Sequence, residues 1–217
     1  MYQTVLFDLD GTLTDPGTGI TNSVAYALEK YGIQASDRTQ LYKFIGPPLQ
    51  DSFEMFYGFS KEDAKKAVGY YREYYREKGI YENKLYEGMD ELLKMLSDAG
   101  KKLLVATSKP EEFAVRILDY FDIRKYFAYT AGANMDGSRS KKAEVISYAL
   151  EAAKVSDIAS SVMAGDREYD VYGAKALGMD AIGVLYGYGS REELEAAGAD
   201  QLAEHPADIA KIIINEK

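Results

Sequence analysis

The sequence predicts an α/β fold in which a doubly wound parallel sheet carries an inserted helical segment. Two observations predict the sheet: short apolar, β-rich runs recur along the chain, and segments with helical spacing separate the later ones. Strands that alternate with helices of about ten residues form parallel βαβ units. A third observation predicts the insertion, because no convincing strand occurs between Pro16 and about Tyr81.

Each predicted strand is bounded by turn or polar residues. The predicted strands are Thr4–Phe7, Lys102–Ala106, Phe127–Thr130, Ser161–Ala164 and Ala181–Leu185. Between the later strands the apolar residues fall on one helical stripe, which predicts helices over Glu111–Phe121, Ala143–Ala152 and Val171–Leu177. Ligands of such sheets bind at the carboxyl ends of the strands, so the residues that follow each strand are candidates for a site.

The inserted segment is predicted to be helical. Helical patterns occur over Ser23–Tyr31 and over Lys61–Lys78, and Ser60 is a good N-cap for the second of these. Gly46-Pro47-Pro48 interrupts a third helical pattern, because a helix interior does not tolerate this sequence. The predicted domains are a Rossmann-like α/β core of residues 1–15 and 82–217 and a small all-helical cap domain of residues 16–81.

The composition excludes several kinds of chemistry. The 217 residues contain no cysteine and one histidine, His205, which excludes disulfides, thiolate nucleophiles and the usual zinc sites. A formal net charge of -9 argues against a nucleic-acid or anionic-membrane partner. The sequence has no signal-peptide pattern at its start and no apolar run of the ~20 residues that a membrane span needs. We therefore expect a cytoplasmic protein, monomeric by default.

Two aspartates follow the first predicted strand. Strand side chains alternate, so Asp8 and Asp10 project to the same side. Two carboxylates this close repel each other, and they are stable together mainly when a cation or a proton lies between them. Gly11 permits the chain to turn sharply away from the strand. The segment Phe7-Asp8-Leu9-Asp10-Gly11-Thr12-Leu13 resembles the first motif of the haloacid dehalogenase-like phosphohydrolases.

Two further segments resemble the second and third motifs of that family, in the expected order. Thr107 closes the predicted strand Lys102–Ala106, and its hydroxyl and the backbone N–H of Ser108 can hold a phosphate oxygen. The lysine of the third motif falls on Lys142, which directly precedes an apolar helix, and Lys141 is the alternative. A helix start disfavours a lysine unless an anion is nearby, because the helix dipole repels a cation there.

The fourth motif follows the predicted strand Ser161–Ala164. The segment from Gly165 to Asp170 matches the family's Gly-Asp-x-x-x-Asp pattern, and Asp170 returns to the side of Asp166 if a helix begins here. In the insert, Gly46-Pro47-Pro48-Leu49 resembles a cap loop of the phosphoglycolate phosphatase and 5'-nucleotidase-like branch, which implies substrate contacts at Gly46 and Pro47. A rigid turn explains that segment equally well.

The resemblance covers nearly the whole chain. It implies a Mg²⁺-dependent phosphatase that acts on a small phosphorylated metabolite, of the phosphoglycolate or nucleoside monophosphate class. Asp8 would be the nucleophile that forms an aspartyl-phosphate, Asp10 the general acid and base, and Thr107, Ser108 and Lys142 would bind the phosphate. The implied metal ligands are Asp8, Asp166, Asp170 and the backbone carbonyl of Asp10. The same motifs fit a phosphomutase acting on a sugar phosphate, and less well a pyrophosphatase or a non-catalytic binding module.

Overall fold

The structure is a computed structural model that describes residues 2–136 and 138–214. The chain forms two compact units. The first comprises Met1–Thr14 and Leu85–Lys217, and the second comprises Asp15–Lys84. Where the chain passes from one unit to the other, β2 (Thr14–Asp15) and β3 (Lys84–Leu85) form a two-stranded sheet. The core and cap roles that the sequence predicts for these parts stay predictions.

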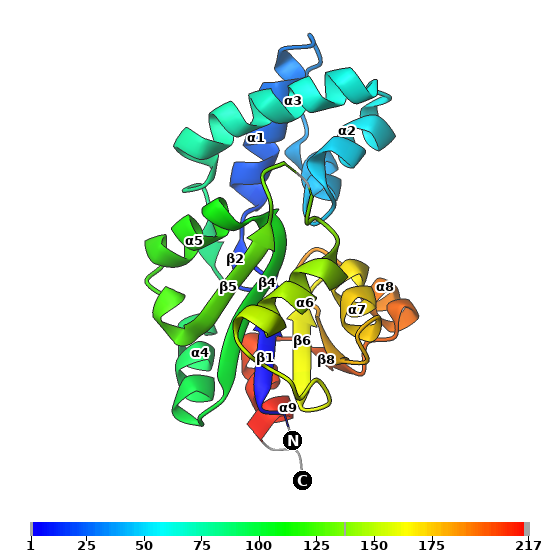
Figure 1. The fold of residues 1–217 in the computed structure, drawn as a ribbon. Helices are drawn as coiled ribbons and strands as arrows, with labels where there is room; N and C mark the ends of the chain where they lie inside the picture. The colour runs from blue at the N-terminus through cyan, green and yellow to red at the C-terminus, as the bar shows by residue number, and fades with distance from the viewer. Residues whose placement is uncertain (1, 137, 215–217) are drawn as a thin grey trace. The chain divides into compact units, whose positions relative to one another are not determined.

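A six-stranded parallel sheet forms the centre of the first unit (Figure 1), in the order β5-β4-β1-β6-β7-β8. All residues of β1 are buried, as expected for a central strand of a parallel sheet that is covered on both faces. The strands are β1 (Thr4–Phe7), β4 (Lys102–Pro110), β5 (Phe127–Ala133), β6 (Ser161–Gly165), β7 (Asp180–Val184) and β8 (Gln201–Ala203).

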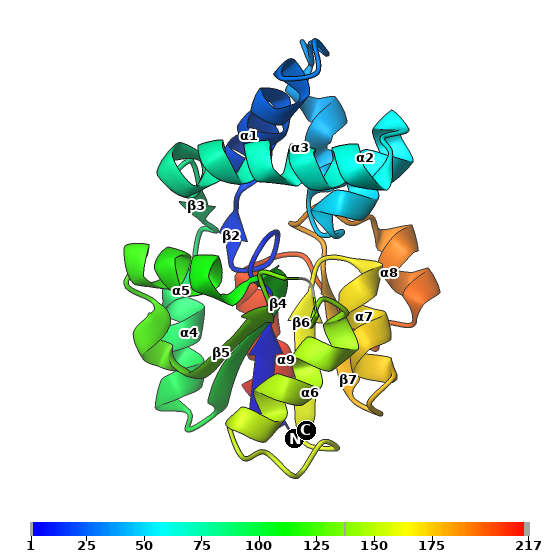
Figure 2. The ribbon, with the colours of Figure 1, turned by 45° about the horizontal axis from the view of Figure 1, so that its top comes forward.

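Helices cover both faces of this sheet. On one face, α6, α7 and α8 bury apolar side chains against Leu6, Leu104 and Met163 of the strands. On the opposite face, α9 lies behind the sheet in Figures 1 and 2 and packs against α4. This arrangement confirms the predicted doubly wound α/β fold. The helices are α4 (Met89–Asp98), α5 (Glu111–Tyr120), α6 (Lys142–Ala152), α7 (Glu168–Lys175), α8 (Arg191–Ala197) and α9 (Pro206–Ile214).

The observed elements differ from the predicted ones mainly at their ends. β1 has the predicted bounds, whereas the strand predicted to end at Ala106 continues to Pro110 with irregular pairing to β5. The sequence analysis did not predict α4, α8, β8 or α9. Over the residues described, none of the helices combines the length and the apolar character that crossing a membrane requires.

The second unit is built from helices. Its α3 packs against both α1 and α2 (Figure 2), and the hydroxyl of Ser60 caps α3 by accepting the N–H of Asp63 at 3.1 Å. The helix predicted over Ser23–Tyr31 begins earlier, because Gly17 already has helical geometry. The helical elements are α1 (Gly17–Glu29), a 3₁₀ helix (Arg38–Phe44), α2 (Leu49–Tyr57), α3 (Lys61–Tyr74) and a π-helical turn (Tyr75–Gly79).

Candidate active site

Asp8 and Asp10 follow β1 in the middle of the sheet. The backbone N–H of Asp8 donates to the Ala164 carbonyl of β6 at 2.9 Å, so that Asp8 extends the pairing of the two strands. Both aspartates are buried, with exposed fractions of 5% and 9%. The chain then turns at Gly11, whose φ of 87° suits a glycine. The central strand therefore ends in two buried carboxylates beside a tight turn.

Lys142 is the first residue of α6 and contacts two of the candidate aspartates. Its Nζ lies 2.8 Å from Asp8 Oδ1 and 2.7 Å from Asp170 Oδ1, and it donates to the Ala106 carbonyl at 3.1 Å. Burial alone would lower the pKa of Lys142, but the two carboxylates outweigh burial and raise this pKa above its ordinary value. The alternative lysine, Lys141, is exposed. The structure thus places Lys142, and not Lys141, among the aspartates.

Asp166 and Asp170 come from the end of β6 and the first turn of α7. Both are buried, with exposed fractions of 0% and 2%. The N–H of Arg167 donates to Asp170 Oδ2 at 3.1 Å, which turns this carboxylate back toward the strand end. Asp8, Asp166 and Asp170 each offer one carboxylate oxygen, and these three oxygens lie within 4.8 Å of one another. Carboxylates from three segments of the chain therefore converge at one point.

The electrostatics of this cluster favour a bound cation. Burial raises the pKa of Asp166 well above its ordinary value, and repulsion from Asp170 and Asp8 raises this pKa further. Burial also raises the pKa of Asp170 to about 6, against the lowering effect of Lys142. A hard divalent cation with oxygen ligands, such as Mg²⁺, would relieve the repulsion. The residues present fit such an ion, because Asp8, Asp166 and Asp170 each offer a carboxylate oxygen as a ligand atom.

The end of β4 brings Thr107, Ser108 and Lys109 to the same edge of the sheet. Thr107 is buried and its hydroxyl accepts the N–H of Lys109 at 3.3 Å, while Ser108 is half-buried. Lys109 Nζ lies 2.6 Å from Asp10 Oδ2, and only 6% and 12% of the two side chains are exposed. Burial raises the pKa of Asp10, although Lys109 opposes that effect. Within the described residues, the buried Oδ1 of Asp10 has no hydrogen-bond partner.

Sequence reasoning missed Lys109 and the loop that follows β7. Lys109 directly follows Thr107 and Ser108 of the second motif but was given no role, and its contact with Asp10 depends on the extension of β4 to Pro110. In the loop after β7, the N–H of Tyr188 donates to Asp166 Oδ2 at 2.8 Å. The glycines around Tyr188 were the available signal, since glycine permits a close approach of one backbone segment to another.

Gly46 and Pro47 belong to the second unit. They lie in the turn between the 3₁₀ helix and α2, and Gly46 has a φ of 103°, which favours glycine at this position. This geometry explains why a glycine stands at the turn. The substrate contacts that the resemblance implies for these two residues stay predictions.

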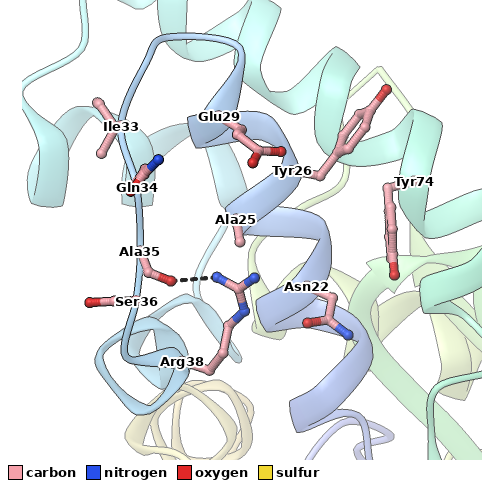
Figure 3. A pocket seen from close by; sticks show the side chains of 10 residues that line it. All are labelled: Asn22, Ala25, Tyr26, Glu29, Ile33, Gln34, Ala35, Ser36, Arg38 and Tyr74. Carbon is pink, nitrogen blue, oxygen red and sulfur yellow. Dashed lines mark hydrogen bonds between the residues drawn. The ribbon is translucent and has the colours of Figure 1, made fainter.

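The second unit also contains a pocket of about 380 Å³ (Figure 3). Several of its polar groups are already paired: Arg38 Nη1 donates to the Ala35 carbonyl at 2.6 Å, and Asn22 Nδ2 and the Tyr74 hydroxyl both donate to Glu82 at 3.1 Å. None of its lining residues belongs to the four motifs. Its lining residues are Asn22, Ala25, Tyr26, Glu29, Ile33, Gln34, Ala35, Ser36, Arg38 and Tyr74.

Comparison with known proteins identifies relatives along nearly the whole chain. The family model of the haloacid dehalogenase-like hydrolases matches residues 5–184. A 5'-nucleotidase of Pseudomonas aeruginosa is 44% identical over 211 residues, which cover 97% of this chain and 94% of the relative. The tyrosine-protein kinase PtkA of Mycobacterium tuberculosis is 38% identical, over 97% of this chain and 71% of its own length.

A solved structure has the same fold. The crystal structure of a predicted phosphatase from Clostridium acetobutylicum matches with a TM-score of 0.95 and 48% identity, and the match covers 99% of each chain. These similarities agree with the four motifs and confirm the predicted enzyme class, a phosphoric monoester hydrolase. The chain belongs to the haloacid dehalogenase-like hydrolase family.

Proposed function

We propose that this protein is a Mg²⁺-dependent phosphatase that hydrolyses a small phosphate monoester through a covalent aspartyl-phosphate. The convergence of Asp8, Asp166 and Asp170 within 4.8 Å carries the proposal. These three carboxylates would hold the cation, with the backbone carbonyl of Asp10 as a further oxygen ligand. The bound cation would offset the negative charge of the phosphate and so permit a carboxylate to approach it.

Asp8 is the nucleophile in this mechanism. One oxygen of its carboxylate attacks phosphorus as the bond from phosphorus to the leaving oxygen breaks, and an aspartyl-phosphate forms. Asp10 donates its proton to the leaving oxygen. Burial raises the pKa of Asp10, which favours the protonated acid that this step needs. Asp10 then takes a proton from the water whose oxygen attacks phosphorus, the bond from phosphorus to Asp8 breaks, and inorganic phosphate leaves.

Lys142 and Thr107 bind and orient the phosphate oxygens. The charge of these oxygens spreads during phosphoryl transfer, so fixed cations and hydrogen-bond donors around them supply much of the stabilisation. Lys142 is held by Asp8, Asp170 and the Ala106 carbonyl, which fixes its ammonium beside the nucleophile. The hydroxyl of Thr107 and the N–H of Ser108 would donate further hydrogen bonds to the phosphate at this edge.

A nucleoside monophosphate is the substrate class that the comparisons support best, because the relative with 44% identity is named a 5'-nucleotidase. Phosphoglycolate is the second member of the proposed class, on the resemblance of the segment Gly46-Pro47-Pro48-Leu49. A phosphate-release assay over both classes, with Mg²⁺ present, distinguishes them. Turnover of neither class would contradict the proposed substrate range.

Transfer to an acceptor hydroxyl is the second candidate reaction, favoured by the 38% identity to a protein named as a tyrosine kinase. The covalent step on Asp8 would be the same, and only the group that accepts the phosphoryl from Asp8 would differ. A phosphomutase would return it to a second hydroxyl of a sugar phosphate. Product analysis in ¹⁸O-labelled water separates these outcomes, because hydrolysis incorporates label into inorganic phosphate and transfer to a hydroxyl does not.

The Asp8→Asn variant tests the proposed nucleophile. Wild-type enzyme quenched with acid during turnover of a ³²P-labelled substrate should carry protein-bound label that hydroxylamine removes, as expected for an acyl phosphate. Asp8→Asn should carry no label and release no phosphate, with an unchanged circular dichroism spectrum. Asp98→Asn is the control, because Asp98 is an exposed carboxylate at the end of α4. Equal labelling of Asp8→Asn and wild type would refute the role of Asp8.

A further inference from the structure

The loop between β7 and α8 lies against the candidate metal ligand Asp166. β7 pairs with β6, and Asp166 directly follows β6, so the chain that leaves β7 emerges next to it. The loop residues Tyr186, Gly187, Tyr188 and Gly189, here called the Tyr186–Gly189 loop, precede the N-cap of α8 at Ser190. No motif in the sequence analysis included them.

We propose that the Tyr186–Gly189 loop is a positioning element that holds Asp166 in the orientation required to bind the metal ion. This inference rests on the proposed function, which takes Asp166 as a metal ligand. Three sets of contacts support it: a backbone hydrogen bond to the carboxylate, a bridge to the turn after the nucleophile, and close packing between glycines and Asp166.

The hydrogen bond fixes one oxygen of the carboxylate. The N–H of Tyr188 donates to Asp166 Oδ2 at 2.8 Å, and the hydroxyl of Thr12 makes a longer contact of 3.4 Å with Oδ1. Asp166 is 0% exposed, so bulk solvent does not reach this carboxylate. A backbone donor cannot swing away as a side chain can, and it therefore restricts the rotation of the carboxylate.

The second set of contacts joins the loop to the turn that follows Asp8 and Asp10. The hydroxyl of Tyr186 donates to the Thr12 carbonyl at 3.1 Å. Thr12 also contacts Asp166 through its hydroxyl, so the loop, the turn and the metal ligand form one connected network. Tyr186 packs in addition against Tyr86, with ring centroids 4.8 Å apart, which holds its ring in place. The loop thereby fixes the position of Asp166 relative to the turn that follows β1.

Close packing restricts Asp166 further. A Cβ at Gly187 would lie 2.3 Å from Asp166 Cβ and 2.4 Å from the Gly11 carbonyl oxygen, and a Cβ at Gly189 would lie 2.0 Å from the Asp166 carbonyl oxygen. Two of these three atoms are backbone oxygens and the third is a Cβ, so none of them can move aside as a flexible side chain would. The glycines therefore let the loop approach Asp166 more closely than any other residue would allow.

Gly187→Ala is the sharpest test. Gly187 does not have a positive φ, so the only penalty on alanine there is the close contact with Asp166 and the Gly11 carbonyl. At Gly11, with a φ of 87°, alanine would also have to adopt a left-handed backbone conformation. We expect Gly187→Ala to weaken Mg²⁺ binding to the metal-free protein by about 10- to 100-fold, the usual effect of losing a partner that orients a ligand. Titration calorimetry with MgCl₂ measures this without any substrate.

A kinetic readout separates positioning from general damage to the fold. Phosphatase activity of Gly187→Ala should need more Mg²⁺ for half-saturation and should approach the wild-type kcat when Mg²⁺ saturates. Gly69→Ala is the matched control, because its Cβ would meet no described heavy atom within 4 Å other than those of its chain neighbours and its own helix backbone. Its Mg²⁺ affinity should equal that of the wild type.

Tyr186→Phe provides a second variant that keeps the ring and removes only the bridge to Thr12. Tyr186→Phe should weaken Mg²⁺ binding by up to about tenfold. If Gly187→Ala does not fold, this variant tests whether the loop positions Asp166. If Gly187→Ala folds and binds Mg²⁺ as tightly as the wild type, the inference is overturned and the proposed metal site stays intact. If Gly187→Ala does not fold, wild-type Mg²⁺ affinity in Tyr186→Phe has the same consequence. A wild-type protein that binds no Mg²⁺ would instead overturn both.

Discussion

Lys142 Nζ lies 2.8 Å from Asp8 Oδ1, and only 5% of the lysine side chain and 8% of the aspartate side chain are exposed. The same ammonium lies 2.7 Å from Asp170 Oδ1. One buried cation thus partners two buried carboxylates. A buried charge that loses its partner is costly, because neither water nor another ion compensates it. Lys142 should therefore contribute to the stability of the metal-free protein, in addition to the phosphate binding proposed for it.

The Lys142→Met variant tests this contribution. Without Mg²⁺ at neutral pH, we expect its free energy of unfolding to fall by about 3–5 kcal/mol, the usual cost of leaving a buried ion pair broken. Urea denaturation followed by circular dichroism measures the change. Lys141→Met is the matched control, since Lys141 is exposed and should change the free energy of unfolding by no more than about 0.5 kcal/mol. Equal losses in the two variants would show that Lys142 does not stabilise the carboxylates.

The acidic cluster predicts how the stabilising effect of Mg²⁺ at the proposed site should depend on pH. Burial raises the pKa of Asp170 to about 6, above its ordinary value of 3.8, and raises the pKa of Asp166 as well. For a carboxyl group with a raised pKa, the folded state holds its proton more tightly than the unfolded state. For Asp170, the stabilisation of the folded state by the bound proton is complete below about pH 3.8 and is lost as the pH rises through about 6. Mg²⁺ needs the deprotonated carboxylates, so it competes with these protons.

At the proposed metal site, Mg²⁺ should raise the melting temperature, and this rise should grow between about pH 5 and about pH 7. When free Mg²⁺ is about 100 times Kd, the stabilisation amounts to about 2.7 kcal/mol. Differential scanning fluorimetry with MgCl₂ and with a chelator measures it at each pH. Asp170→Asn should abolish most of the increase, whereas Asp98→Asn should keep it. A Mg²⁺ effect that does not change over this pH range would contradict the assignment of the metal ligands.

The sheet was predictable because its strands are buried. Thr4–Phe7 is continuously apolar apart from its first residue and is followed by Asp8, so the sequence predicts both that this segment is a strand and where it ends. β8 could not be read in the same way, because the three residues Gln201–Ala203 are too few to show a period. The signal for α4 was present, since Met89, Leu92, Leu93 and Leu96 are spaced for one helical face, and all four are buried.

The candidate site was predictable where its residues stand at fixed distances in sequence from a strand. Asp8 and Asp166 directly follow strands, so their meeting at one edge follows from the parallel sheet. The contact between Lys109 and Asp10 depends on how far β4 extends past Ala106, which no local pattern specifies. The contact between Tyr188 and Asp166 depends on the path of a loop and uses only a backbone N–H, so the identity of the side chain carries no signal.

Gly173→Ala tests how tightly α7 holds the lysine. Alanine in a helix interior usually stabilises a protein by about 0.5–1 kcal/mol relative to glycine. At Gly173, however, the new Cβ would lie 2.7 Å from Lys142 Cγ and 3.0 Å from Lys142 Cβ. The ammonium of Lys142 has three partners, so its stem cannot move aside without breaking contacts. We expect kcat to fall by up to about 10²-fold, as a displacement of about 1 Å can cause, with no gain in stability.

Gly69→Ala is again the control for this comparison. It lies in α3, and apart from its chain neighbours and its own helix backbone no described heavy atom comes within 4 Å of the added Cβ, so only the helix preference acts. Its free energy of unfolding should rise by about 0.5–1 kcal/mol and its kcat should stay unchanged. If Gly173→Ala gains the same stability and keeps its kcat, the contact with Lys142 does not constrain the lysine.

The paired phenols of Tyr129 and Tyr148 predict a second pH effect, at alkaline pH. Their oxygens are 2.8 Å apart. This hydrogen bond, together with partial burial, raises the pKa of Tyr129 from 10.0 to about 12. Between these two values the unfolded chain loses the proton and the folded chain keeps it, so the free energy of unfolding falls as the pH rises from about 10 to about 12.

Tyr129→Phe should reduce the slope of the free energy of unfolding against pH, because phenylalanine has no proton to lose. Urea denaturation at several pH values compares the slopes, and an unchanged slope in Tyr129→Phe would mean that other groups cause the alkaline loss of stability.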